Sequence, residues 1–278
     1  MCRLFGLTAG TARVKATFWL VDAPDSLEKQ SHRNVDGSGI GFFDQGGVPV
    51  LDKQPEPAFS DPEWIREAQQ AESAQFIAHV RWATAGGRSQ QNTHPFSMNG
   101  RIMAHNGGIG SLSRLDAHLG SYARLVRGDT DSERFFALIT KETDAQGGDV
   151  GAGLAAAARW IAVNLPLSSL NTIVAAPGEL WALRYPDQHA LHIVENPSPH
   201  LRSARSSIHL LPSIDRAEPP ATVVVASERL DDESGWRMLA PGELVHVTAD
   251  LAVHSSIAIP DPPAQLIPLP PGNPNIDT

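Results

Sequence analysis

The single cysteine of the chain, Cys2, lies directly after the initiator methionine. If Met1 is removed, Cys2 carries a thiol with a pKa of about 8.5 and a free α-amine with a pKa of about 7.7–8.0, so the amine is partly unprotonated at neutral pH. The amine can then take the thiol proton, directly or through a water, and one residue supplies both nucleophile and general base. The position alone is equally compatible with an inert cysteine on a first strand.

A second candidate group lies in the stretch HVRWATAGGRSQQNTHPF, residues 79–96. A strand is expected to end at Arg81, before a loop that contains Gly86 and Gly87. An arginine at the end of a strand, facing a pocket, can grip a carboxylate with two parallel hydrogen bonds. The alternative is a surface arginine beside a buried Trp82.

The stretch AHNGGIG, residues 104–110, allows two interpretations. It looks like a strand that runs into a turn at residues 106–108, because Asn-Gly is the commonest hairpin turn. In the functional interpretation, the side-chain amide of Asn106 and the backbone N–H of Gly107 converge on a developing negative oxygen and form an oxyanion hole.

The stretch GDTDSE, residues 128–133, places two acidic residues before an expected helix. Thr130 and Glu133 have the spacing of a helix N-cap, and this role accounts for both of them. Asp131, in the first turn, has no part in the cap, so its carboxylate is a candidate partner for an ammonium group of a ligand.

The elements that must position these residues alternate between strands and helices. Short runs rich in Val, Ile and aromatic residues predict strands, and capped or apolar-periodic runs predict helices. Strands early, helices in the middle and strands again indicate an α+β sandwich with antiparallel sheets. The expected strands are residues 76–81, 101–106, 170–176, 179–184, 190–194, 222–227 and 243–248, and the expected helices are residues 61–73, 130–142 and 151–165.

Composition narrows the class of protein. The chain has 278 residues, of which 41% are hydrophobic, and a net charge of -9. This acidic balance argues against nucleic acids and anionic membranes as partners, since both require a basic surface. One cysteine and eleven histidines without metal-ligand spacing predict no metal site and no cofactor. No signal peptide or membrane span is recognisable, which favours a cytoplasmic protein.

The C-terminal segment differs from the rest, because seven prolines lie between Pro260 and Pro274. We expect residues 260–278 to form an extended or disordered tail over the surface, after a single domain over residues 2–259.

Taken together, the motifs resemble the class II glutamine amidotransferase domains, which are N-terminal nucleophile (Ntn) hydrolases. Six stretches follow in the order of that family: MCRLFGL, HRNVDGSGIGFF (32–43), HVRWATAG, NTHPF, AHNGGI and DTDSE. The late stretch VVVASERLDDESGWRMLAPGEL also resembles the region that closes this domain. The resemblance implies a four-layer αββα sandwich of two antiparallel sheets.

The resemblance also implies roles for individual residues. Cys2 matches the nucleophile that attacks the γ-carbonyl of glutamine, and Asn106 and Gly107 match the oxyanion-hole pair. Arg81 matches the residue that holds the substrate α-carboxylate, and Asp131 the residue that holds its α-amine. The remaining matches are Arg33, near the glutamine pocket, and Trp82 and Thr84, in the pocket wall.

The function implied is cleavage of the γ-amide of glutamine through a γ-glutamyl thioester on Cys2. One alternative is a hydrolase of γ-glutamyl amides or peptides, as in glutathione breakdown or ergothioneine synthesis. An inactive binding module and a thiol redox sensor are weaker alternatives, because neither requires Asn106, Arg81 and Asp131 together. The chain shows no phosphate-binding loop and no room for a synthase domain, so any ammonia acceptor would be a separate partner protein.

Overall fold

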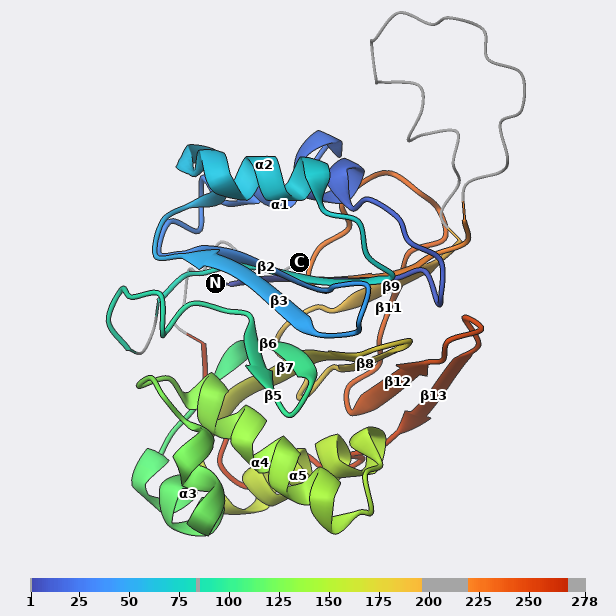
Figure 1. The fold of residues 1–278 in the computed structure, drawn as a ribbon. Helices are drawn as coiled ribbons and strands as arrows, with labels where there is room; N and C mark the ends of the chain where they lie inside the picture. The colour runs from blue at the N-terminus through green and yellow to red at the C-terminus, as the bar shows by residue number, and fades with distance from the viewer. Residues whose placement is uncertain (1, 84–85, 197–219, 270–278) are drawn as a thin grey trace, which may run out of the picture.

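The computed structural model describes residues 2–83, 86–196 and 220–269. Two antiparallel sheets lie face to face, with helices on the outer side of each, so the layers follow the order αββα (Figure 1). The expected four-layer αββα sandwich of two antiparallel sheets is confirmed. All seven expected strands overlap observed strands, and the structure adds β1, β2, β3, β5, β11 and β13.

The first sheet has seven strands in the order β11-β9-β10-β1-β4-β2-β3. In β1, Phe5 and Leu7 face the outer helices, whereas Leu4 faces the second sheet, as the two-residue period of a strand requires. The bounds are β1 (Arg3–Thr8), β2 (Ser38–Phe43), β3 (Pro49–Gln54), β4 (Gln75–Val80), β9 (His192–Glu195), β10 (Val223–Ala226) and β11 (Arg237–Met238).

The second sheet has six strands in the order β13-β12-β8-β7-β6-β5. The expected turn at residues 106–108 is wrong, because β6 continues through them and pairs with β7 with Asn106 opposite Asn171. Pairing with β7 keeps the backbone of Asn106 and Gly107 extended. The bounds are β5 (Phe96–Met98), β6 (Arg101–Ile109), β7 (Leu167–Ala176), β8 (Glu179–Leu183), β12 (Glu243–Val247) and β13 (Val253–Ile257).

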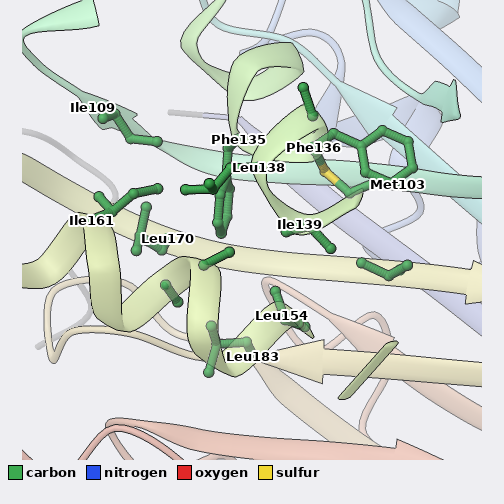
Figure 2. Packing of buried hydrophobic residues seen from close by; sticks show 14 of the residues in the cluster. Met103, Ile109, Phe135, Phe136, Leu138, Ile139, Leu154, Ile161, Leu170 and Leu183 are labelled. Carbon is green, nitrogen blue, oxygen red and sulfur yellow. The ribbon is translucent and has the colours of Figure 1, made fainter. Parts of the chain in front are cut away.

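Helices α1 and α2 cover the first sheet, and α3, α4 and α5 cover the second (Figure 1). The cores under both layers are apolar, and Figure 2 shows Phe135 and Phe136 of α4 packed towards β6 and β7. The bounds are α1 (Leu27–Gln30), α2 (Pro62–Gln70), α3 (Leu112–Leu119), α4 (Asp131–Ala145) and α5 (Val150–Asn164), with short η1 (Phe18–Asp22), η2 (Ala58–Ser60) and η3 (Gly120–Leu125).

The start of α4 is capped largely as the sequence predicts. Thr130 Oγ1 accepts a hydrogen bond from the N–H of Glu133 at 3.2 Å. The Glu133 carboxylate does not return to Thr130 but accepts the N–H of Gly128 at 2.6 Å. The cap therefore fixes the chain before the helix as well as its first turn.

The proline-rich segment, in the part that the structure describes, pairs with the first residue of β7. The N–H of Leu167 donates to Gln265 O at 3.0 Å, and the N–H of Ile267 donates to Leu167 O at 2.8 Å. Residues 270–278 lie outside the described residues, and a domain boundary at residue 259 stays a prediction. Within the described part of the chain, no helix combines the length and the apolar character that a membrane crossing would need.

Candidate active site

Sheet topology brings Cys2 next to residues 80 positions away in the chain. Strands β1 and β4 are antiparallel neighbours with Arg3 opposite Val80, so the start of β1 lies beside the end of β4. Cys2 Sγ lies 3.3 Å from both the backbone N and the backbone O of Trp82. From the second sheet, Asn106 Nδ2 donates to the carbonyl oxygen of Cys2 at 2.9 Å. Three strands therefore converge on this residue.

The surroundings of Cys2 shift the pKa of its thiol in opposite directions. Burial raises the pKa of the thiol, and the negative charge of Asp131 raises it further. The hydrogen bond from Trp82 and the positive charge of Arg81 lower the same pKa. Because burial is the largest of these effects, the thiol is kept protonated and needs a nearby base to become a nucleophile.

Arg81 is held in place immediately after β4. Its backbone N–H donates to Gly37 O at 2.7 Å, which continues the pairing with the neighbouring strand. Its guanidinium donates to two loop carbonyls, Gly87 O at 3.2 Å and Gly86 O at 3.3 Å, and the residue is only 3% exposed. The guanidinium is therefore pre-oriented by backbone, as a carboxylate-binding arginine needs to be.

Asp131 is the first residue of α4 and is buried. Its Oδ2 accepts the N–H of Ile109, at the end of β6, at 2.8 Å. Its Oδ1 accepts the N–H of Ser132 at 2.9 Å. These bonds fix the carboxylate between the helix start and the strand that carries Asn106, where it can receive an ammonium group.

Gly107 is in close contact with its neighbours within β6. A Cβ on this residue would lie 1.8 Å from the carbonyl oxygen of Ser169 and 2.7 Å from Nε2 of His105. Real Cβ atoms essentially never lie closer than 3.0 Å to another atom, and the 1.8 Å contact is with backbone, so the position requires glycine for steric reasons. A hairpin turn would select glycine for a positive φ, which Gly107 does not have, so close packing within the sheet replaces the hairpin interpretation.

The other candidate residues from the sequence are distributed around Cys2. The side chain of Trp82 is 47% exposed, so it is not the buried tryptophan of the alternative interpretation. Thr84 lies outside the described residues. Arg33 is exposed and lies 3.5 Å from Asp25 and 3.8 Å from Glu228. Glu228 also pairs with Arg3, which donates to the carbonyl oxygen of Cys2 at 3.4 Å. A place for Arg33 near the glutamine pocket stays a prediction.

Asp36, within residues 32–43, supports the site, and the sequence motif did not predict a role for it. Its Oδ2 accepts the N–H of Ala83 at 2.8 Å, and its Oδ1 forms an ion pair with Arg88. Its backbone N–H donates to Arg81 O at 3.0 Å. The signal that could have revealed it is an acidic residue just before Gly37 and a strand.

Asn92 joins the same loop to the chain that precedes α4. Its Nδ2 donates to Gly87 O at 3.2 Å, and its Oδ1 accepts the N–H of Asp129 at 2.8 Å. Asn92 therefore connects the segment that holds Arg81 with the segment that leads to Asp131. Among the residues that the structure describes, no three His, Cys, Asp or Glu side chains are grouped as a metal site requires.

The sequence profile of a family described as "Glutamine amidotransferases class-II" matches residues 1–264. The chain belongs to this family. Family membership confirms the expected enzyme class, an amidohydrolase that acts on γ-glutamyl amide bonds. It also accounts for the order of the six sequence stretches from MCRLFGL to DTDSE.

Two similar proteins differ in how much of their length is matched. The "Gamma-glutamyl-hercynylcysteine sulfoxide hydrolase" of Mycobacterium tuberculosis is 29% identical over 258 residues, which are 89% of this chain and 93% of that protein. The "Glutamine--fructose-6-phosphate aminotransferase [isomerizing]" of Corynebacterium glutamicum is 31% identical over 117 residues, but these are 41% of this chain and 19% of that protein.

Solved structures show the same fold. A glutamine aminotransferase class-II domain protein from Silicibacter pomeroyi has a TM-score of 0.61 at 21% identity, with 91% of this chain and 98% of that chain covered. The glutamine phosphoribosylpyrophosphate amidotransferase from B. subtilis has a TM-score of 0.64 at 18% identity, with 95% of this chain and 50% of that chain covered.

Proposed function

We propose that this class-II glutamine amidotransferase hydrolyses a γ-glutamyl amide through a thioester on Cys2, with Arg81 and Asp131 binding the two ends of the glutamyl α-carbon. The observation that carries the proposal is electrostatic. Backbone hydrogen bonds fix the positions of Arg81 and Asp131, and their opposite charges shift the pKa of the Cys2 thiol in opposite directions. A glutamyl group presents a carboxylate and an ammonium on one carbon, which matches such a pair of charges.

The reaction proceeds in two balanced steps. The α-amine of Cys2 takes the thiol proton, and the thiolate attacks the γ-carbonyl carbon. The Asn106 amide and the Gly107 N–H stabilise the oxyanion; the C–N bond then breaks, and the leaving nitrogen takes the proton back. Water next attacks the thioester, and the products are glutamate and the free thiol.

This mechanism requires removal of Met1, because an acylated nitrogen is not a base. The Asn106 bond fixes the carbonyl of Cys2, and the pairing of β1 with β4 begins at the next residue, Arg3. We expect the intact mass of active protein to correspond to a chain that starts at Cys2. An active species that retains Met1 would exclude the α-amine as general base.

Two kinds of leaving group fit the proposed reaction. Glutamine is one candidate. A larger γ-glutamyl conjugate is the second, and it is favoured by the nearly end-to-end match to a γ-glutamyl-hercynylcysteine sulfoxide hydrolase. The match to a sugar-phosphate aminotransferase supports less, because it covers only 19% of that protein.

A substrate panel tests the proposal. Purified protein is offered glutamine, glutathione and several γ-glutamyl amides, and released glutamate is measured, with Cys2→Ala as the control. We expect glutamate from at least one amide and none from the control. Release by Cys2→Ala at the wild-type rate, or by neither protein, would refute the proposal. Transfer of ammonia to a separate synthase and a cytoplasmic location stay predictions from the sequence.

A further inference from the structure

A buried polar bridge connects the strand of the oxyanion pair to the helix of Asp131. We define the bridge as the side chains of His105 and Ser132 and the carbonyl of Ser169. Nδ1 of His105 lies 2.9 Å from Ser132 Oγ, and Nε2 of His105 lies 3.1 Å from Ser169 O. The two side chains are 1% and 5% exposed, so water does not substitute for these contacts.

The partners decide which atom carries each proton. Ser169 O is a carbonyl oxygen and only accepts, so Nε2 of His105 carries the hydrogen of that bond. Burial lowers the pKa of His105, and the ring is therefore neutral, with Nδ1 unprotonated. The Ser132 hydroxyl must then donate to Nδ1 of His105.

This direction matters for Asp131. Ser132 Oγ also lies 3.5 Å from Asp131 Oδ1, and one hydroxyl proton serves only one acceptor at a time. The bond to His105 at 2.9 Å is the better one, so the hydroxyl turns away from the carboxylate. Oδ1 of Asp131 then accepts the backbone N–H of Ser132 and keeps acceptor capacity for a ligand.

We propose that His105 and Ser132 are positioning residues for recognition of the substrate α-ammonium, because their hydrogen bond orients the start of α4 and leaves the Asp131 carboxylate open to the ligand. The inference rests on the proposed function, in which Asp131 binds that ammonium. It goes beyond it by assigning a role to two residues that do not touch the substrate.

The packing around the ring makes the bridge rigid. His105 lies edge-on to Phe135 of α4, with ring centroids 5.4 Å apart, and Phe135 belongs to the core shown in Figure 2. On its other side, Nε2 of His105 occupies the space that a Cβ of Gly107 would need. The ring therefore touches the oxyanion pair and the helix of Asp131 at once.

The test uses three forms of whichever amide the panel identifies. One has the intact γ-glutamyl group, one has a glutaryl group without the α-amine, and one has a 4-aminobutanoyl group without the α-carboxylate. We expect Ser132→Ala to lower kcat/KM about tenfold for the two forms that carry the amine, the effect of one buried hydrogen bond. The glutaryl form should be unaffected, so the preference for the amine falls by the same factor.

Three further variants separate positioning from general damage. Ser132→Thr keeps the hydroxyl and should restore the preference. His105→Phe should reduce it as Ser132→Ala does, and the double variant should be no worse than either single one, since the two residues act as a unit. Thr140→Val is the matched control, because Thr140 lies buried on the same helix and its hydroxyl has no hydrogen-bond partner within the described residues.

The outcomes are distinct. Loss of amine preference in Ser132→Ala and His105→Phe, with wild-type preference in Ser132→Thr and Thr140→Val, supports the inference. An unchanged preference in Ser132→Ala and His105→Phe would overturn it while leaving the proposed function intact. A wild-type protein that hydrolyses no γ-glutamyl amide would overturn the proposed function and this inference with it.

Discussion

Replacement of Gly107 by alanine tests the steric argument for this position most directly. The added Cβ would lie 1.8 Å from Ser169 O, so β6 and β7 would have to separate locally by about 1.2 Å to reach even the tightest real contact. The same Cβ would displace the ring of His105, which lies 2.7 Å away. The neighbouring atom is backbone, so side-chain rotation does not relieve the clash.

The magnitude follows from two effects. Overpacking of a tight site costs about 1–3 kcal/mol, and loss of the bond between His105 and Ser169 costs about 1 kcal/mol more. We therefore expect Gly107→Ala to lower the free energy of unfolding by about 2–4 kcal/mol, which corresponds to a fall in Tm of about 3–7 °C for a domain of this size.

The assay is thermal unfolding followed by circular dichroism, with glutamate release measured below the transition. Gly108→Ala and Gly110→Ala are matched controls on the same segment. Their Cβ atoms would lie 3.0 Å from the rotatable Ser168 Oγ and 3.4 Å from Pro166. We expect both controls to stay close to the wild-type Tm. A Gly107→Ala protein within about 2 °C of Gly108→Ala would refute the reasoning.

Three other predictions concern catalysis, recognition and acid stability. Asn106→Ala should lower kcat about a hundredfold or more with little change in KM, because its amide meets charge that exists only in the transition state; a normal kcat would exclude the oxyanion role. Arg81→Lys should lower kcat/KM at least about tenfold, since an ammonium does not reproduce the bidentate fork. N-acetylglutamine, whose α-nitrogen is uncharged, should be a very poor substrate for the wild type. Its efficient hydrolysis would contradict the assignment of Asp131. Burial lowers the pKa of His79 from 6.5 to about 3, so below pH 6.5 the unfolded chain binds a proton that the folded chain does not. As the pH is lowered below 6.5, this residue should therefore reduce the free energy of unfolding by up to about 1.4 kcal/mol per pH unit. Urea denaturation at several pH values should show a shallower decline for His79→Phe than for the wild type, and equal slopes would contradict the expectation.

The sequence by itself determined the features that depend on near neighbours in the chain. Caps at Asp61 and Thr130 were predictable, because each bond joins residues within three positions. The main strands followed from runs of β-branched and aromatic residues, and the order of the six stretches around Cys2 predicted the family. The short or glycine-rich strands, such as β2 and β5, were missed because their signal lies in their partners.

Only the tertiary structure decided which of these residues act on one another. Asn-Gly reads as a turn from local preference, and pairing with β7 places it inside β6 instead. The motif predicts Arg33 near the pocket, and only the fold shows that it lies 3.8 Å from Glu228, 195 positions later, which also pairs with Arg3 beside Cys2. The bond between His105 and Ser132 joins a strand to a helix across 27 positions. Such contacts arise when the two sheets and the helices pack to bury their apolar faces. The local sequence does not predict which polar groups this packing brings together.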